Sequence, residues 1–213
     1  MNTPNKVLME QARGTLEGKW LIGVKVTAIY AIISMALQFI PVLGGLVSLL
    51  ISGPLTLGLA IFWLSFSRNQ NPAISKMFDG FDTWWRAVKA YILMGIYIFL
   101  WLLLLIVPGI IAAYSYAMTF YILSEDKNIK IDDAINKSKE MMKGNKWKLF
   151  CLGCRFIGWG LLCILTLGIG FLWLIPYVQV SMAKFYDDVK NKGAESEVPK
   201  PQIPEVTPLS ATS

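Results

Sequence analysis

The sequence of 213 residues contains no histidine and only three cysteines, Cys151, Cys154 and Cys163. Without histidine, no side chain has an ordinary pKa near neutrality, so the sequence excludes Ser/His and Cys/His nucleophile pairs and most catalytic zinc sites. Charge is also scarce, because 16 % of the residues are charged whereas 55 % are hydrophobic. Soluble domains usually carry about a quarter charged residues. We therefore expect a membrane protein, with no enzymatic activity, no metal and no cofactor.

The few charges leave long stretches of the chain without any. Formal charge is absent from three windows: Val26–Ser67, Ala90–Ser124 and Phe156–Ala183. A helix needs about 20 apolar residues to cross the hydrocarbon core of a bilayer. Each window is interrupted near its middle by proline and glycine, which end helices or let the chain reverse. The interruptions are Pro41–Gly45, Pro108-Gly109 and Gly168–Gly170.

This pattern predicts an all-α, polytopic membrane helical bundle of about six transmembrane helices, paired as three hairpins. The expected spans cover residues 20–40, 46–66, 89–107, 109–124, 147–167 and 169–186. Pro54 and Pro176 are expected to kink the second and sixth spans. Pro108-Gly109 can instead be a kink within one long helix, which leaves four or five spans as the alternative.

The positions of the basic residues predict the topology. Every lysine and arginine lies outside the windows, and the three expected hairpin tips carry none. Because basic loops stay in the cytoplasm, we predict that both termini are cytoplasmic. The net charge of +6 fits this topology and an attraction to anionic lipid headgroups, and we expect no nucleic-acid binding. Residues 1–190 should form one membrane domain, and the proline-rich segment 191–213 a disordered cytoplasmic tail.

Three cytoplasmic segments share a pattern of an amphipathic helix, a glycine and a tryptophan at the membrane entry. Their apolar positions are Val7, Leu8, Ala12 and Leu16; Ile74, Met77, Phe78 and Phe81; and Ile131, Ala134, Ile135, Met141 and Met142. Trp20, Trp85 and Trp147 are the expected interfacial anchors. The pattern suggests a threefold internal repeat with units 6–66, 73–124 and 131–186. We expect the three helices to lie in the membrane interface as a collar around the bundle.

Few polar side chains are candidates for a site within the membrane. Arg155, Gln38 and Tyr116 are the ones we single out. For Arg155 we expect the side chain to reach the headgroups, with a ligand-binding position facing the bundle as the alternative. Cys151 and Cys154 form a Cys-x-x-Cys motif, but a metal site lacks two further ligands, so we expect both to be packing residues.

The second half of the chain carries a specific series of motifs. They are Pro108-Gly109-Ile110-Ile111, Tyr114-Ser115-Tyr116, Ser138-Lys139, Met142-Lys143-Gly144, Lys146–Phe150, Phe156–Trp159, Thr166–Gly170, Trp173, Pro176-Tyr177 and Phe185-Tyr186. Leu16-x-Gly18-x-Trp20 and Gly53-Pro54-Leu55-x-Leu57-Gly58 add weaker matches. Over residues 6–190 the chain resembles a family of bacterial integral membrane proteins, domain-of-unknown-function family 975.

The resemblance implies a bacterial, multi-pass plasma-membrane protein and no particular activity. We expect a non-enzymatic role as a scaffold, a partner-binding protein, or an envelope-stress or immunity-type protein. A small-solute or lipid permease is the alternative. The expected partners are the lipid bilayer with its anionic headgroups, other membrane proteins and further copies of the chain.

Overall fold

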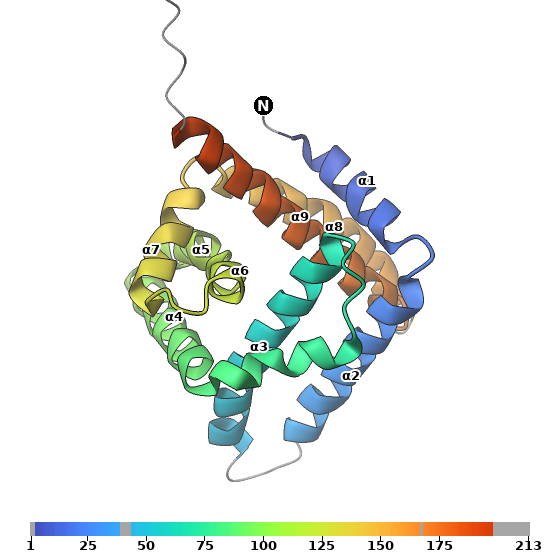
Figure 1. Ribbon diagram of the computed structural model, residues 1–213, viewed down its shortest axis with the longest axis horizontal. Helices are drawn as coiled ribbons and strands as arrows, with labels where there is room; N and C mark the ends of the chain where they lie inside the picture. The colour runs from blue at the N-terminus through green and yellow to red at the C-terminus, as the bar shows by residue number, and fades with distance from the viewer. Residues whose placement is uncertain (1–2, 39–43, 167, 198–213) are drawn as a thin grey trace, which may run out of the picture.

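The computed structural model describes residues 3–38, 44–166 and 168–197, and every regular element among them is a helix (Figure 1). In chain order these are α1 (Asn5–Leu16), α2 (Trp20–Gln38), α3 (Gly44–Ser67), the 3₁₀ helix η1 (Ile74–Thr83), α4 (Trp84–Leu104), α5 (Ile106–Tyr116), α6 (Thr119–Glu125), α7 (Ile131–Met141), α8 (Lys146–Leu165) and α9 (Phe171–Glu197). The predicted all-α class is confirmed for the described residues.

Several of these helices are long and apolar enough to cross a membrane. The described residues contain five such segments: Trp20–Leu37, Val47–Ser67, Ile74–Leu104, Ile106–Glu125 and Lys146–Leu165. The expected sixth span, α9, is not among them. Its charge-free part, Phe171–Ala183, is shorter than the roughly 20 residues that a crossing needs. The count of six and the repeat stay predictions, whereas membrane-compatible helices are a finding.

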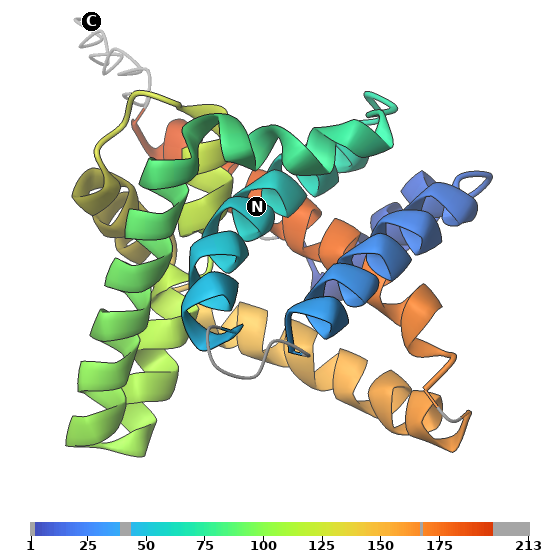
Figure 2. The same ribbon diagram turned by 90° about the horizontal axis from the view of Figure 1, so that it is seen from below.

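The chain reverses between α4 and α5 at a different residue from the one predicted. Leu105 has φ −164° and ψ 143° and separates the two helices, which run side by side (Figure 2). Pro108 lies in the first turn of α5, where the missing N–H costs no hydrogen bond within the helix. Gly109 packs on α4, because a Cβ there would lie 2.8 Å from the Cα of Leu102. Pro108-Gly109 therefore lies near the start of α5 and is not the reversal itself.

The other two expected reversals are described only in part. Residues 39–43 lie outside the described chain, as does residue 167. Gly168, between α8 and α9, has φ +86°, which an L side chain rarely adopts. Beyond it, α9 continues to Glu197, so its last turns extend into the segment that we predicted as a tail. Residues 198–213 are outside the described part.

The apolar faces of α1 and α7 are buried against other helices, which contradicts the predicted interfacial collar. On α1, Leu8 is 1 % exposed and Leu16 is fully buried, and Figure 1 shows α1 lying along α9. On α7, Ile135 is 1 % exposed. The amphipathic pattern has the same period on lipid and on protein, so it could not distinguish the two. Gly18, at φ +74°, turns the chain from α1 into α2.

The segment η1 docks on α3 through its backbone. A Cβ at Gly58 of α3 would overlap the carbonyl of Met77, and one at Gly80 would overlap the carbonyl of Pro54. Met77 is fully buried, whereas Phe78 and Phe81 are 44 % and 39 % exposed. Because a 3₁₀ helix has three residues per turn, its docking face contains every third residue. Phe78 and Phe81 therefore lie outside the face that docks on α3, and their burial in the membrane interface stays a prediction.

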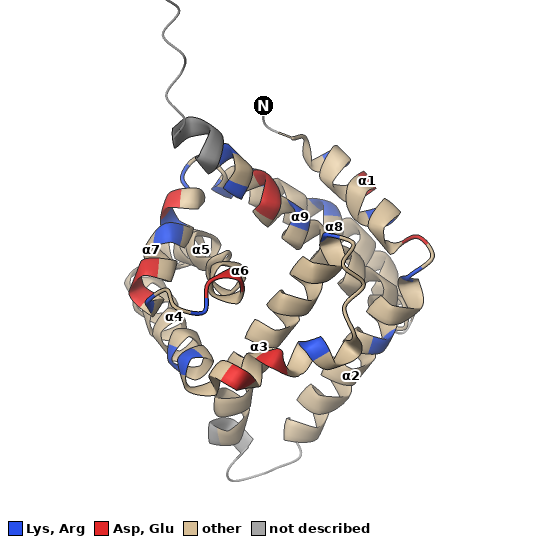
Figure 3. Cartoon of the chain, viewed as in Figure 1, with Lys and Arg blue, Asp and Glu red and all other residues tan. Residues whose placement is uncertain are grey.

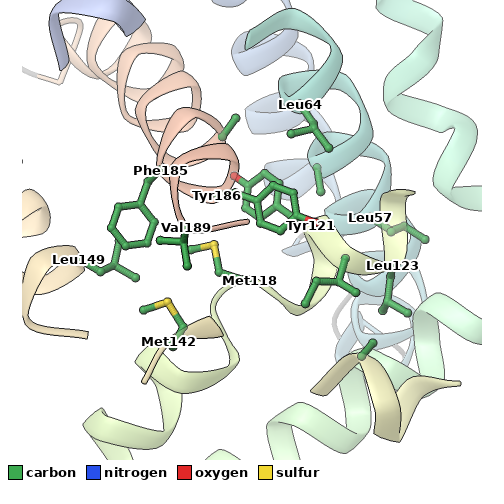
Figure 4. Packing of buried hydrophobic residues seen from close by; sticks show 14 of the residues in the cluster. Leu57, Leu64, Met118, Tyr121, Leu123, Met142, Leu149, Phe185, Tyr186 and Val189 are labelled. Atoms are coloured by element: carbon green, nitrogen blue, oxygen red, sulfur yellow. The ribbon is translucent and has the colours of Figure 1, made fainter. Parts of the chain in front are cut away.

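The largest core cluster draws residues from α1, α4 and α7 as well as from α3, α6, α8 and α9. Figure 4 shows Tyr121 of α6 lying on Tyr186 of α9, with Leu64 of α3 nearby. The two tyrosine rings are stacked, with centroids 5.4 Å apart. This stacking holds together helices that lie far apart in the sequence, and it places the hydroxyl of Tyr186 beside the charged end of α6.

Candidate functional site

A cavity of about 290 Å³ lies where α2, α3, α9 and the junction between α5 and α6 come together, and we call it the central cavity. Most of its wall is apolar, including Trp63 and Phe120. Its polar groups include Thr27 of α2, Thr56 of α3 and Gln179 of α9. Small-molecule sites typically combine apolar walls with a few converging polar groups, and this cavity has that composition.

Thr27 is the polar group in the cavity that most clearly lacks a partner. Its side chain is 3 % exposed, and its Oγ1 has no hydrogen-bond partner among the described residues. By contrast, the hydroxyl of Thr56 donates to the carbonyl of Ser52, 2.6 Å away. An unpaired buried hydroxyl costs free energy, which a bound water or ligand would recover.

A cluster of ion pairs lies at the charged ends of the helices that line the cavity. Arg68, just after α3, has its guanidinium 2.6 Å from a carboxylate oxygen of Glu125 and 2.6 Å from one of Asp187. Lys190 is also 2.6 Å from Glu125, which accepts a hydrogen bond from the hydroxyl of Tyr186. The hydrogen bonds to Asp187 and then to Glu125 raise the pKa of Arg68 above its ordinary value, although burial opposes them.

The cluster and the cavity share the same helices. On α3, Ala60 lines the cavity and Arg68 is two turns further on, about 12 Å along the axis. On α6, Tyr121 lines the cavity, one turn before Glu125. The ion pairs therefore lie beyond the cavity along α3 and α6.

A second ion pair fastens α8 to α9. The ammonium of Lys148 lies 2.6 Å from a carboxylate oxygen of Asp188. Burial by itself raises the pKa of Asp188, but hydrogen bonds from Lys148 and Thr3 outweigh it and leave the pKa below its ordinary value. The side-chain amide of Asn5 donates to the carbonyl of Lys148 at 2.8 Å, so α1 joins the same contact.

The structure does not bring Arg155 and Tyr116, two of the three predicted polar residues, together. Arg155 is exposed on α8, and no ion-pair partner lies near it among the described residues. Gln38 ends α2, and its side chain lies outside the described part of the chain. Tyr116 is 3 % exposed on α5, with the ammonium of Lys139 5.5 Å from its ring centroid. Neither Arg155 nor Tyr116 lines the central cavity.

Sequence reasoning missed the cluster of Arg68, Glu125 and Asp187, although a signal was present. Arg68 and Glu125 are the first charged residues after the first and second windows, and Asp187 follows closely after the third. If a helix leaves the membrane at the end of each window, these three charges lie at the same depth relative to the bilayer. Figure 3 shows the charges gathered at helix ends and surface helices, with uncharged runs along α2 and α3.

The other predicted residues have mixed environments. Trp85 and Trp147 are 60 % and 73 % exposed, as interfacial anchors would be, whereas Trp20 is half-buried against the core. Cys154 is exposed and Cys163 is buried. Within the described residues, no group of three or more Cys, Asp or Glu side chains is placed to hold a metal ion.

A comparison with family models matches most of the chain. The family model described as "Protein of unknown function (DUF975)" matches residues 1–116 and 102–193. No curated protein and no solved structure matches the chain. Since the two matched segments together cover most of the sequence, the chain belongs to the DUF975 family of proteins of unknown function.

Proposed function

We propose that the protein is a non-enzymatic, multi-pass protein of the bacterial plasma membrane, threaded as three hairpins with both termini in the cytoplasm. The observation that carries the topology is the cluster of Arg68, Glu125 and Asp187. These residues lie at or just beyond the ends of α3 and α6 and in the last part of α9. Helices whose charged ends pair with one another end on the same side of a membrane.

The apolar surface of the described residues supports a location in lipid. At the end of the α4–α5 pair, Leu103 is 74 % exposed, Leu104 69 % and Val107 66 %. A contiguous apolar surface of this kind needs a cover, and hydrocarbon chains supply it. For the short apolar part of α9, we propose a crossing in which the bilayer thins locally or flanking lysines reach the headgroups.

For the role of the protein, we favour a scaffold or partner-binding function of an envelope-stress or immunity type. The partly buried carboxylates Glu125, Asp187 and Asp188 are used in ion pairs that fasten helices together. On the proposed cytoplasmic side, α7 presents an exposed charged face that includes Lys137 and Glu140. A membrane bundle held together by ion pairs, with charged helices facing the cytoplasm, suits a protein that binds partners.

Site-specific photo-crosslinking in native membranes tests this role. A photoreactive residue at position 137, on the exposed face of α7, should give a discrete adduct with a protein. The matched control is position 165, where Leu165 is 79 % exposed on α8 and should contact lipid alone. Adducts with lipid at both positions would contradict a partner-binding role of α7.

A second candidate function is passage of a small solute, and the central cavity favours it. The cavity is lined by helices from all three proposed hairpins, and Thr27 and Gln179 place polar groups within it. Purified protein in liposomes should then move a defined solute, and Thr27→Val or Gln179→Leu should reduce the flux. Flux that is unchanged in both variants would contradict a path through this cavity.

A further inference from the structure

A trough of about 360 Å³ lies between the α4–α5 pair and the turn that joins α7 to α8. It is separate from the central cavity, which has none of the same lining residues. Basic residues line part of it and mostly apolar residues line the rest. The basic residues are Lys139, Lys143 and Lys146, and the apolar ones include Trp101, Pro108 and Ile111.

The turn between α7 and α8 brings the three lysines to one place. Lys139 and Lys143 are four residues apart, at the end of α7 and just beyond it. Gly144 has φ +75°, which reverses the chain so that Lys146, the first residue of α8, lines the same trough. Ser138 fixes α7 on α5, since its hydroxyl donates to the carbonyl of Ser115 at 2.8 Å.

The charge of the trough is uncompensated within the described part of the chain. Lys139, Lys143 and Lys146 have no ion-pair partner there, whereas the nearby Lys148 is paired with Asp188. The ammonium of Lys139 lies 5.5 Å from the ring centroid of Tyr116 and 5.9 Å from that of Tyr97. Like charges that converge repel each other, and an anion between them would relieve the repulsion.

The surroundings of the trough resemble a boundary between headgroups and hydrocarbon. Trp147, next to Lys146, is 73 % exposed, as is typical of an interfacial tryptophan. Beyond the apolar part of the trough, the end of the α4–α5 pair exposes Leu103 and Leu104. Lysine is costly in hydrocarbon, so the three ammonium groups need an anionic partner beside this apolar surface.

We propose that this trough binds one anionic phospholipid. Its phosphate lies against Lys139, Lys143 and Lys146, and an acyl chain follows Trp101, Pro108 and Ile111. A free phosphate ion would satisfy the lysines but leave the apolar wall uncovered, and a zwitterionic lipid would bring no net charge to the lysines. The proposal rests on the proposed function, because it requires the chain to lie in a bilayer.

Native mass spectrometry of the detergent-solubilised full chain, titrated with phosphatidylglycerol, tests the proposal. The wild type should bind one lipid saturably, and K139Q/K143Q/K146Q should bind it about tenfold or more weakly. The matched control K127Q/K130Q/K137Q removes as many charges from exposed positions outside the trough and should bind like the wild type. An equal loss in both triple variants would overturn the proposal, because it would show a general effect of charge.

A second variant keeps the charges and fills the apolar part of the trough. Ile111→Trp adds a ring where Ile111 is 47 % exposed, and should also weaken phosphatidylglycerol binding. Phosphatidylcholine should bind far more weakly to the wild type, and inorganic phosphate should not displace phosphatidylglycerol. Displacement by inorganic phosphate, or equal binding of both lipids, would overturn the assignment of an anionic lipid.

Extraction of native membranes at alkaline pH examines the membrane assignment separately. Release of the chain into the soluble fraction would refute the proposed function, and the lipid site with it. If the chain stays in the membrane while K139Q/K143Q/K146Q binds phosphatidylglycerol like the wild type, only the lipid site is refuted.

Discussion

The guanidinium of Arg68 lies 2.6 Å from a carboxylate oxygen of Glu125, although the two residues belong to different apolar windows of the sequence. Each is the first charged residue after its window. Asp187, 2.6 Å from the same guanidinium, completes the arrangement from α9. The charges that follow the apolar stretches are thus paired with one another. This pairing fixes where α3, α6 and α9 lie relative to one another along their axes.

Replacing Arg68 with alanine should destabilise the folded protein. Its side chain is 33 % exposed, which lies between a surface pair and a buried one, so we expect a loss of about 1–3 kcal/mol. Thermal unfolding in detergent measures it. Arg155→Ala is the matched control, because Arg155 is exposed without an ion-pair partner in the described chain.

In a double-mutant cycle, Arg68→Ala and Glu125→Ala should cost less stability together than the sum of the single variants. Additive losses would contradict the pairing.

Replacing Gly58 with alanine should disrupt the docking of η1 on α3. The added methyl group would overlap the backbone carbonyl of Met77, and backbone cannot move aside as a flexible side chain can. We expect the free energy of unfolding, measured in detergent, to fall by about 1–3 kcal/mol. Gly95→Ala on α4 is the control, since nothing lies within 4 Å of its Cβ position. That variant should be neutral or slightly stabilised by helix propensity. Equal effects of the two variants would refute the backbone contact.

Substitutions in η1 distinguish a packed segment from one immersed in lipid. Met77 is fully buried, so Met77→Ala should cost about 2–5 kcal/mol. Phe78→Ala should cost far less in detergent, because Phe78 is 44 % exposed. The same unfolding assay compares them. If Phe78→Ala were the more damaging of the two, the face that we assign to the protein would be wrong.

The ion pair between Lys148 and Asp188 should make stability depend on acid pH. Because the pKa of Asp188 is lowered in the folded state, the pair contributes fully above the ordinary carboxyl pKa, about 3.9. Its contribution is lost as the pH falls through the lower folded value. The melting temperature of the wild type should therefore fall more steeply below about pH 4 than that of Asp188→Asn or Lys148→Met. Parallel curves for the three proteins would contradict the assignment.

Prediction from the sequence was most accurate for features that depend on local composition. Charge-free stretches predict apolar helices, and α2, α3 and α8 begin and end close to the expected positions. Asp132 and Asp133 lie in the first turn of α7, where the helix dipole favours negative charge. The helix break at Leu105 was not predictable, because leucine has no tendency to end a helix and the close approach of Gly109 to Leu102 is a tertiary contact.

The contacts between distant segments were beyond prediction from one sequence. Gly58 and Gly80 look like ordinary helix or turn residues until the structure places their backbones together. The burial of Leu8 and Leu16 against other helices follows from tertiary packing, since their spacing suits lipid equally well. The trough combines Tyr116, which the sequence singled out as a polar residue within the membrane, with lysines that the sequence analysis used only to predict topology.

The central claim is that α3, α6 and α9 end on the cytoplasmic side. Single cysteines are placed at Asn69, Asn128 and Asn191 in a chain without its native cysteines. All three positions are exposed; the first two follow α3 and α6, and the third lies in the last turns of α9. A membrane-impermeant thiol reagent added to intact cells should leave all three unlabelled and should label them once the cells are opened. A cysteine at Ile169, between α8 and α9, should label in intact cells. Labelling of residue 128 from outside while 69 and 191 stay protected would contradict the shared level of the three helix ends.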